Sequence, residues 1–548
     1  MKLQKTYNPQ EYESDIYDLW EQSGGFEPTG KGEPFVMIMP PPNANARLHI
    51  GHALMFSIED IIVRYQRMKG KDVLWLPGAD HAGFETQVVY EKHLAKEGKS
   101  RFDFSREELY SQIMDFVGQN KENFDAIFRS LGASCDWTRF TFTLDDTIVD
   151  TSYKTFKKMW DDGLIYRGER LVNYCTQHRT GFADIEVVYE DRNTPLYYMK
   201  YGPFTLATTR PETKFGDTAV AVHPDDERYK KYIGKVIEVE GLNGPFELQV
   251  VADEYVDPEF GTGAVKISPA HDFNDWDIAQ RHKLPAIRVI NHDGTLNHHA
   301  GEFEGMSVGE ARKAVVNGLK EKGLLEKVDE TYQNRVGTCY KCGTQIEPML
   351  LDQWFINMRK LAEPAIKALE DKKISFYPES KRSETVRYLQ NVRDWNISRQ
   401  IAWGIPIPAF QNVNDPDDWV FNTQVAEEIL EIDGKKYRRD PDVFDTWFSS
   451  GQWPFVTLGY PDDDDFKKYY PTDLMETGVD ILYQWVARMI CLGIYVTNDI
   501  PFKEVYLHGM VRAEDGKKMS KSIGNVIDPQ EILDSYGSDA LRMGIMAG

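Results

Sequence analysis

The stretch at residues 34–83, "PFVMIMPPPNANARLHIGHALMFSIEDIIVRYQRMKGKDVLWLPGADHAG", decides the fold. It opens on a continuous apolar run, which is typical of a strand buried on both faces. The apolar residues after Gly51 recur at helical spacing and share one face: Leu54, Ile58, Ile61, Ile62 and Tyr65. The segment "KDVLWLPGADHAG" then indicates a second strand and its exit loop. Strand, helix and strand in this spacing predict a βαβ unit of a parallel sheet.

The bulk composition is that of a soluble globular protein. The chain has 548 residues, 41% of them hydrophobic and 28% charged, and this length predicts about three or four domains. The N-terminus has no apolar core for a signal peptide, and we find no run of about 20 apolar residues. We therefore expect a cytoplasmic protein with no membrane partner. Its net charge of −23 disfavours RNA on a uniform surface, but a local basic groove remains compatible with it.

The sequence pattern changes near residue 190, where short strands broken by Gly and Pro begin. This pattern predicts a separate β-rich domain, and a pattern typical of α/β structure returns after it. The simplest architecture is one nucleotide-binding domain split by a large insertion. We expect a helical segment at 1–33, the first half of that domain at 34–189, the insertion at 190–338, the second half at 351–528 and the start of a helical stem at 529–548.

Two histidines stand where a parallel sheet binds its ligands. In doubly wound sheets, ligands bind beyond the carboxyl ends of the strands, where helix N-termini present free N–H groups. His49 and His52 occupy such a place, three residues apart, and Gly51 lets a nucleotide approach the backbone. Imidazole N–H groups there can stabilise a phosphate as its charge builds. The alternative is ordinary packing, one histidine in the core and one on the surface.

A basic loop follows near the end of the chain. The stretch "GKKMSKSIGN" at 516–525 places Lys518 and Lys521 three residues apart, with Ser520 and Ser522 beside them. Such a loop can close over a triphosphate and neutralise it during phosphoryl chemistry. The alternative for this loop alone is a solvated surface segment.

Taken together, "HIGH" at 49–52 and "KMSKS" at 518–522 resemble the two signatures of the class I aminoacyl-tRNA synthetases. The resemblance extends over nearly the whole chain and is strongest to the valyl branch of that family. The motifs follow in the order of that branch: "GADHAGFETQ", "ATTRPET", "EFGTGAVKISPAHDFND", "NISRQ", "FDTWFSS", "TGVDILYQWVARM" and "YGSDALR". The resemblance implies an α/β fold with a Rossmann-type parallel-sheet catalytic domain, split by a β-rich editing domain.

The activity implied by the resemblance is adenylation of valine by ATP with Mg²⁺, followed by transfer to tRNA(Val). Positioning and charge stabilisation would supply most of the catalysis. The implied catalytic residues are His49, His52, Lys518 and Lys521, with Gly51, Ser520 and Ser522 at ATP. The implied amino-acid site contains Pro41, Asn43, Asp80, Trp447, Ile481 and Trp485, where Asp80 suits the substrate ammonium. Ile481 and Trp485 fall four apart, so on one helix they would form one wall; ordinary core packing is the alternative.

An apolar pocket rejects threonine, which is nearly isosteric with valine, only about 10²-fold, a case for which this enzyme family is itself the standard example. The resemblance therefore implies that the insertion hydrolyses misacylated tRNA, with Asp275 holding the free amino group. The other implied editing residues are Thr208, Arg210, Thr213, Lys266, Ser268 and Asp272. The alternative for the two threonines is plain strand propensity.

Two short pairs of metal-binding residue types flank the insertion. Cys175 and His178 lie within 172–180, and Cys339 and Cys342 lie within 339–350. Four soft ligands of this kind suit a tetrahedral structural zinc. The alternative is four unrelated residues. The chain has five cysteines in all, too few for a disulfide scaffold of its size.

The chain departs from the valyl pattern at several places. Ala46 and Arg47 stand before the first signature where other residues are usual, and "WGIPIPAF" at 403–410 resembles the isoleucyl or leucyl enzymes. Isoleucine specificity is thus the near alternative. A non-ligating, RNA-binding or regulatory paralogue and a small-molecule nucleotidyltransferase are the alternatives from other classes. We expect a monomer. The family's helical anticodon-binding domain would be missing, because about 20 residues after Asn525 cannot form a bundle.

Overall fold

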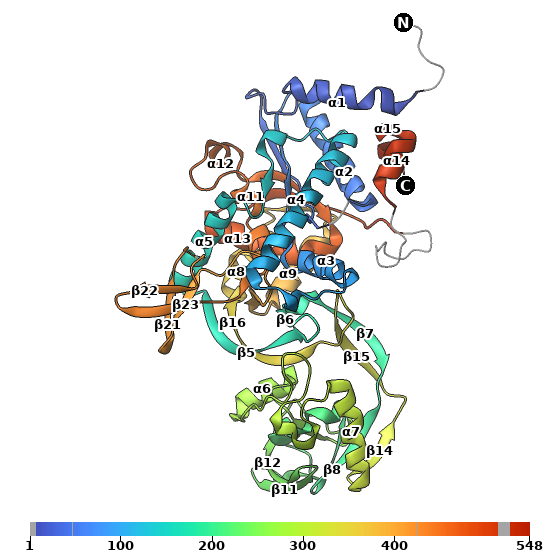
Figure 1. Ribbon diagram of the computed structural model, residues 1–548, viewed down its shortest axis with the longest axis vertical. Coiled ribbons are helices and arrows are strands. Elements are labelled where there is room, and N and C mark those ends of the chain that lie inside the picture. The colour runs from blue at the N-terminus through green and yellow to red at the C-terminus, as the bar shows by residue number, and fades with distance from the viewer. Residues whose placement is uncertain (1–6, 46–47, 425, 513–526, 548) are drawn as a thin grey trace. The chain divides into compact units, whose positions relative to one another are not determined.

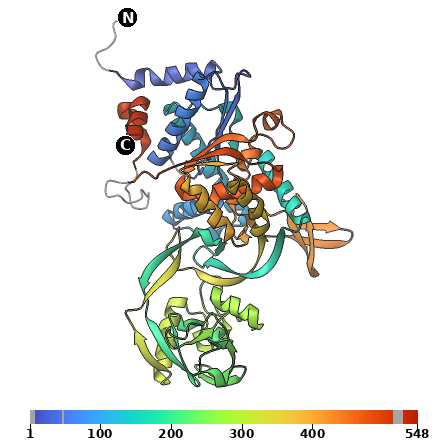
Figure 2. The same cartoon turned by 180° about the vertical axis from the view of Figure 1, so that it is seen from behind.

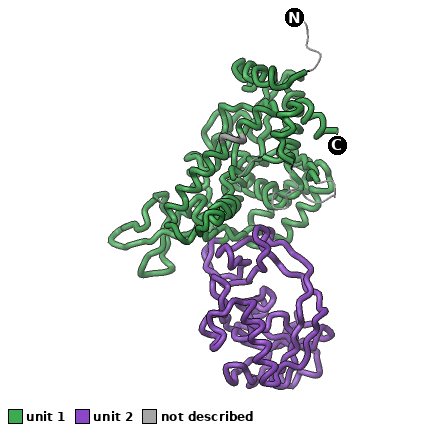
Figure 3. Tube along the Cα trace, turned by 45° about the vertical axis from the view of Figure 1, so that its right-hand side comes forward, with its two compact units in different colours: residues 1–166, 355–548 green, residues 167–354 purple. Residues whose placement is uncertain are grey.

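The computed structural model describes residues 7–45, 48–424, 426–512 and 527–547 (Figure 1; seen from behind in Figure 2). The chain separates into two compact units, one of residues 1–166 with 355–548 and the other of residues 167–354 (Figure 3). The first unit is therefore made of two distant segments of sequence. The predicted insertion at 190–338 lies inside the second unit.

A parallel five-stranded sheet organises the first unit, in the order β17-β26-β25-β1-β2. Its strands are β1 (Pro34–Ile38), β2 (Asp72–Leu76), β17 (Ser375–Tyr377), β25 (Thr472–Gly478) and β26 (Phe502–His508). All of its pairings are parallel. From β1 the chain passes to β2 on one side, and from β25 it passes to β26 on the other. The strand order thus reverses between β1 and β25, which makes this junction the switch point where open α/β sheets bind ligands.

The predicted βαβ unit is present, and its helix is α2 (Ile50–Met68). The face predicted for that helix is wrong, because Ile61 is 45% exposed and Tyr65 is 57% exposed. The buried side includes Glu59 and Asp60 instead. Glu59 accepts a hydrogen bond from Trp75 Nε1 at 3.1 Å, so a polar side chain occupies a place that hydrophobicity alone assigns to solvent.

Helices surround the sheet of the first unit. They are α1 (Glu13–Gln22), α2, α3 (Gly83–Lys96), α4 (Arg106–Ser130), α5 (Asp146–Asp161), α8 (Met358–Glu370), α9 (Ser380–Gln390), α10 (Thr446–Ser450), α11 (Trp453–Val456), α12 (Asp464–Tyr469), α13 (Ala487–Thr497), α14 (Pro529–Tyr536) and α15 (Ser538–Ala547). Short strands complete the unit: β3 (Gly78–Ala79) with β4 (Thr141–Phe142), β19 (Ser398–Arg399) with β24 (Val443–Phe444), β18 (Trp395–Asn396), and a small sheet of β20 (Ala409–Asn412), β21 (Asp415–Phe421), β22 (Ile429–Ile432) and β23 (Lys435–Arg439).

One helical run in this unit, Val479–Thr497, is long and apolar enough to cross a membrane by length and composition. We did not expect any such stretch from the sequence. An 18-residue stretch of this run has a mean hydropathy of 1.4, and 61% of that stretch is buried inside the protein. The core helix of a soluble protein can be equally long and apolar, so this run is weak evidence for a membrane span.

The second unit is rich in short antiparallel strands, as predicted. Its sheets contain β5 (Ile165–Cys175), β6 (Thr180–Phe182) and β16 (Glu347–Ile356); β7 (Val187–Asn193) and β15 (Gln333–Cys339); β8 (Leu196–Tyr201), β9 (Phe204–Thr208) and β14 (Leu325–Asp329); and β10 (Ala219–Val222), β11 (Val236–Gly241), β12 (Gly244–Ala252) and β13 (Ala264–Ile267). Two helices, α6 (Phe273–His282) and α7 (Val308–Glu321), accompany them. The unit has its own apolar core, with Met199, Val220 and Val250 fully buried.

Candidate functional site

The strand β1 ends just before three prolines, which cannot donate to a neighbouring strand. The chain then turns into α2, and His49 is the residue that caps this helix. His49 Nδ1 accepts a hydrogen bond from Gly51 N at 3.1 Å, and His52 Nδ1 accepts one from His49 N at 3.1 Å. The two rings lie 3.9 Å apart between centroids. The histidines thus form a reciprocal cap at the helix start.

This cap fixes the tautomers of both rings. A neutral imidazole whose Nδ1 accepts a hydrogen bond carries its proton on Nε2. The proton of each ring is therefore on Nε2, and an Nε2–H group is the kind of donor that binds phosphate oxygens. Gly51 is required by the same packing, because a Cβ there would lie 2.9 Å from Cε1 of His49. The basic loop predicted to act with them, including Lys518, Ser520, Lys521 and Ser522, lies outside the described residues, as do Ala46 and Arg47.

Asp80 lies directly after β3, beside the exit of β1. Its backbone forms a parallel bridge with that of Asn43. Its Oδ1 accepts hydrogen bonds from Ala82 N at 2.7 Å, Thr446 Oγ1 at 3.0 Å and Thr143 Oγ1 at 3.3 Å. Among the described residues, no hydrogen bond reaches Oδ2. One oxygen is thus held by three neutral donors.

Burial sets the charge of this group and its neighbour. Burial raises the pKa of Asp80 to about 6, against the opposing effect of its three hydrogen bonds. Burial lowers the pKa of the adjacent His81 to about 3, so that its ring stays neutral. His81 Nδ1 lies 2.7 Å from Thr143 Oγ1, which ties the imidazole to the same cluster. At neutral pH the cluster carries one net negative charge, suited to a cationic ligand.

The other predicted residues of the amino-acid site occupy the same end of the sheet. Pro41 is half-buried and Asn43 is exposed, both between β1 and α2, and Trp447 is half-buried near the start of α10. Trp485 is buried and donates from Nε1 to Ser450 O at 2.9 Å. Ile481 ends a 3₁₀ turn, and Trp485 lies in a π-helical turn at Leu482–Val486. The single α-helical wall expected from their spacing is therefore wrong, because the helix is wound differently at the two residues. A π turn inside a helix is frequent at functional sites.

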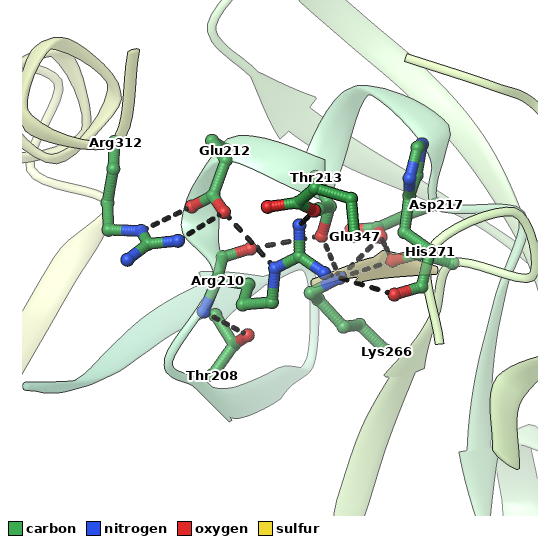
Figure 4. A network of polar contacts seen from close by, with 10 residues as sticks. Thr208, Arg210, Glu212, Thr213, Asp217, Lys266, His271, Arg312 and Glu347 are labelled. Carbon is green, nitrogen blue, oxygen red and sulfur yellow. Dashed lines mark hydrogen bonds and ion pairs between the residues drawn. The ribbon is translucent and has the colours of Figure 1, made fainter. Parts of the chain in front are cut away.

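In the second unit, three of the predicted editing residues, Thr213, Lys266 and Ser268, converge on one polar network (Figure 4). Lys266 Nζ donates to Thr213 Oγ1 at 3.0 Å and to Asp217 Oδ1 at 2.9 Å, and it also contacts Ser268 Oγ. Ser268 Oγ donates to Asp217 Oδ1 at 2.5 Å, while Tyr201 donates its hydroxyl to Asp217 Oδ2 at 2.7 Å. Asp217 is therefore the centre of this network.

A second set of charges adjoins it. Arg210 donates to His271 O at 3.2 Å and to Glu212 at 3.3 Å, and it also contacts Glu347. Arg312 donates twice to Glu212, at 2.8 and 2.9 Å. The two carboxylates are buried and the two arginines are half-buried, and Figure 4 shows how these pairs tie the loop after Thr208 to its neighbours. The guanidinium of Arg210 is thus engaged by two carboxylates and a backbone carbonyl.

Asp272 and Asp275 lie at the start of α6. Asp272 caps the helix by accepting from Asn274 N at 2.8 Å and Asp275 N at 3.2 Å. Asp275 is 8% exposed and accepts from Ser268 N at 2.8 Å. Burial, helped by the nearby charge of Asp272, raises the pKa of Asp275 to about 8. This carboxyl group thus gains its proton near neutral pH unless a cation is bound beside it.

Three cysteines of the predicted metal site come together. The thiols of Cys175, Cys339 and Cys342 all lie within 4.8 Å of one another, and the first and last are 3.6 Å apart. His178 is buried and is not part of the converging group. Hydrogen bonds with the thiols of Cys175 and Cys339 lower the pKa of Cys342. Three thiols and an imidazole are a donor set that fits zinc.

Sequence reasoning missed several buried charged residues. Asp217, Glu212, His271, Arg312 and Glu347 were not singled out, although Glu212 and Asp217 both stand in "RPETKFGDTAVAV", which runs into a buried strand. The signal available was a charged residue inside an otherwise apolar segment, which must be paired when it is buried.

The first unit also contains buried charged residues inside apolar segments. Glu59 of α2 and Glu476 of β25 are both fully buried. Glu476 contacts His508 at the end of β26. Burial, together with the charge of Glu476, raises the pKa of Glu59.

The model of the family described as tRNA synthetases class I (I, L, M and V) matches residues 15–548. The chain is 46% identical to the valine--tRNA ligase of Thermotoga maritima, over 99% of this chain and 63% of that protein. It is 43% identical to the valine--tRNA ligase of Clostridium acetobutylicum, over 100% of this chain and 63% of the relative. The chain belongs to the class I tRNA synthetases.

Solved structures of class I tRNA synthetases share this fold. The ternary complex of Agrobacterium radiobacter K84 agnB2 LeuRS with tRNA and LeuAMS aligns with a TM-score of 0.56 at 19% identity, covering 99% of this chain and 72% of that chain. Mycobacterium tuberculosis methionyl-tRNA synthetase bound by methionyl-adenylate aligns with a TM-score of 0.50 at 16% identity, covering 94% and 64%. The α/β fold class predicted from the sequence is confirmed. The chain spans less than two thirds of the length of the valine--tRNA ligases that it matches.

Proposed function

We propose that this chain activates valine with ATP and transfers it to tRNA(Val). The observation that carries the proposal is Asp80, whose Oδ1 is held by three neutral donors while Oδ2 receives none from the described residues. A carboxylate held in this way is pre-organised for an ammonium group. It lies in the same unit as the two histidines that cap α2 beyond the carboxyl end of β1. The similarity to valine--tRNA ligases supports valine as the amino acid.

In the proposed reaction, the valine carboxylate attacks the α-phosphorus of ATP, a new P–O bond forms, and pyrophosphate leaves. Asp80 holds the ammonium group so that the carboxylate faces the nucleotide. The Nε2–H groups of His49 and His52 donate to the phosphate oxygens as their charge grows. Lys518 and Lys521 hold the leaving pyrophosphate, with Ser520 and Ser522 beside them. Mg²⁺, when bound with ATP, neutralises phosphate charge.

The amino acid lies against apolar walls in this proposal. Trp447, Ile481 and Trp485 exclude larger side chains, and Pro41 and Asn43 close the side next to β1. The indole Nε1 of Trp485 already donates to Ser450 O, so that its ring is fixed before a substrate arrives. Such a fixed wall selects by size and shape.

The test is ATP–pyrophosphate exchange with a panel of amino acids. We expect exchange with valine, and Lys518→Ala or Lys521→Ala should slow it strongly. Exchange that is much faster with isoleucine than with valine would show that the chain is an isoleucine-specific enzyme. If the wild-type chain exchanges with no amino acid, the non-ligating paralogue becomes the better description.

We further propose that the second unit hydrolyses threonyl-tRNA(Val). Lys266, Thr213 and Ser268 form one network with Asp217, and Asp275 reaches the backbone of Ser268. In this proposal Asp275 holds the amino group of the misattached residue, Asp272 orients the start of α6, and Thr208 and Arg210 form the wall beside it. Deacylation of supplied threonyl-tRNA by the chain tests this activity separately from exchange.

The three converging thiols support a structural zinc held by Cys175, Cys339, Cys342 and His178. Zinc would cross-link the ends of β5 and β15 and would take no part in either reaction. We expect one zinc per chain by elemental analysis, lost in Cys339→Ser with Cys342→Ser, together with a lower melting temperature of the second unit. Wild-type protein that is stable and contains no metal would remove this site.

We also propose that the enzyme is cytoplasmic and monomeric.

A further inference from the structure

A buried ionic cluster lies directly behind the proposed amino-acid site. Asp445 is 2% exposed and caps α10 by accepting from Trp447 N at 3.2 Å through Oδ1. Its Oδ2 accepts from Trp395 Nε1 at 2.8 Å and lies 2.9 Å from Arg399 Nη2. Arg399 also donates to the carbonyls of Asn396 and Ser398, both at 3.0 Å. One arginine therefore already neutralises this carboxylate.

A second arginine faces the same carboxylate from another helix. Arg488 of α13 is 4% exposed, and its Nη1 lies 3.7 Å from Asp445 Oδ2. Its guanidinium lies over the ring of Trp395, 3.8 Å from the centroid. Among the described residues, Nη1 has no hydrogen-bond partner. Two buried guanidinium groups thus share one carboxylate.

Stability of the fold does not account for the second cation. Burying a charge is costly unless it is paired and hydrogen-bonded, and an apolar side chain in its place is often neutral or stabilising. The stacking of Arg488 on Trp395 offsets part of that cost. The part of this cost that is not offset indicates that Arg488 has a role in the neighbouring amino-acid site.

The segment anchored by this cluster touches the ligand site at consecutive residues. Asp445 is followed by Thr446, whose Oγ1 donates to Asp80 Oδ1 at 3.0 Å. Trp447 follows, with its backbone N–H held by Asp445. Arg488 also stands three residues after Trp485, which donates to Ser450 O at the other end of α10. The helical run Val479–Thr497 therefore grips α10 at both ends.

We propose that Arg488 is a positioning residue for the amino-acid site: through Asp445 it fixes Thr446 against Asp80 and Trp447 in the pocket wall. This role rests on the proposed activation of an amino acid. Displacing the segment weakens amino-acid binding and leaves the nucleotide contacts of His49 and His52 unchanged, because those come from α2.

Three variants test the role. Arg488→Met keeps the length of the side chain and removes the charge, and Arg488→Lys restores a charge. Arg139→Met is the matched control, since Arg139 belongs to the same unit and pairs with the buried Asp136 and with Asp465, and not with Asp445. Arg488→Met should raise KM for valine about tenfold or more, because small misplacements of a site are amplified in this way. KM for ATP should change less than twofold, and Arg488→Lys should recover most of the loss.

Two further readouts separate positioning from folding. Arg488→Met should melt no lower than Arg139→Met, since it removes an incompletely paired charge. Acrylamide quenching of Trp447, isolated by subtracting the signal of a Trp447→Phe version of each protein, should increase in Arg488→Met only. Unchanged KM for valine with unchanged quenching would overturn the proposal. A wild-type chain that activates no amino acid would defeat the proposed function, whereas the quenching of Trp447 would still decide the role of Arg488.

Discussion

Asp80 in the first unit and Asp275 in the second are two buried carboxylates with the same proposed duty, binding the amino group of a substrate. Asp80 is 6% exposed and Asp275 is 8% exposed, so burial alone does not distinguish them. Their pKa values nevertheless differ, about 6 for Asp80 and about 8 for Asp275. Three neutral donors lower the pKa of Asp80, and the like charge of Asp445 opposes them only weakly. Asp275 has one backbone donor, and the like charge of Asp272 acts on it more strongly than the opposite charge of Lys266. The polar neighbours thus tune each group for its own pH range.

The largest expected effect in this comparison comes from Asp80→Asn. Asparagine is nearly isosteric and keeps an oxygen for Ala82 N and Thr446 Oγ1, so the fold should persist. The charge that faces the substrate ammonium is lost, and truncating a buried charge pair costs about 2–5 kcal/mol. We expect KM for valine in pyrophosphate exchange to rise about 10²-fold or more. A rise below threefold would place the ammonium elsewhere.

Asp275→Ala should have the next largest effect, and only on the other unit. Removing this carboxyl should slow deacylation of threonyl-tRNA(Val) by about tenfold or more, since a hydrogen bond to a charged group contributes about 1.5–3 kcal/mol. Pyrophosphate exchange with valine should remain at the wild-type rate, because Asp80 is untouched. Equal deacylation by wild type and variant would remove Asp275 from the editing site.

The pH dependence of the two reactions should differ in the same sense as the two pKa values. A protonated carboxyl cannot pair with an ammonium, so binding is lost as pH falls through each value. KM for valine should rise up to about tenfold per pH unit below about 6, and editing should lose efficiency already below about 8. Asp272→Asn removes the like charge next to Asp275 and should move the loss of editing efficiency to lower pH. The rise in KM for valine, measured on the same preparation, should stay at the same pH.

This comparison also marks how far the sequence could be interpreted. The place of His49 and His52 followed from the apolar run before them and from the rule that parallel sheets bind ligands beyond their carboxyl ends. The partners of Asp217 in the second unit could not be found in this way. Tyr201 reaches it from the end of β8, in another sheet, and the antiparallel pairing of β10 with β13 brings Lys266 and Ser268 to it.

Local winding was likewise beyond the sequence. The spacing of Ile481 and Trp485 predicts one α-helical face, but a π turn intervenes. Hydrophobicity placed Ile61 and Tyr65 of α2 on a common apolar face, whereas the fold buries Glu59 and Asp60 with polar partners of their own. A pattern of apolar residues cannot reveal such partners, because they come from other segments of the chain.

The smallest expected effect concerns Lys214, a buried lysine of the second unit. Lys214 is 3% exposed, makes no side-chain hydrogen bond with the described residues, and points at three aromatic rings. Its Nζ lies 5.0 Å from the ring centroid of Phe246, 5.5 Å from that of Tyr201 and 5.7 Å from that of Phe215. Burial lowers its pKa to about 8 from the usual 10.5.

A base whose pKa is lowered by folding binds fewer protons in the folded chain than in the unfolded one between about pH 8 and 10.5. The free energy of unfolding therefore rises with pH across that window, and below pH 8 the full cost of the buried charge is present. Lys214→Met removes that cost together with the weaker attraction of the rings, so we expect a net gain of about 1–2 kcal/mol at pH 7. The melting temperature should rise by a few degrees at pH 7 and approach that of wild type near pH 10.5. Lys235→Met, at an exposed lysine of the same unit, should change neither value. A variant of Lys214 that melts lower than wild type at pH 7 would show instead that the aromatic cage outweighs the cost of burying the charge.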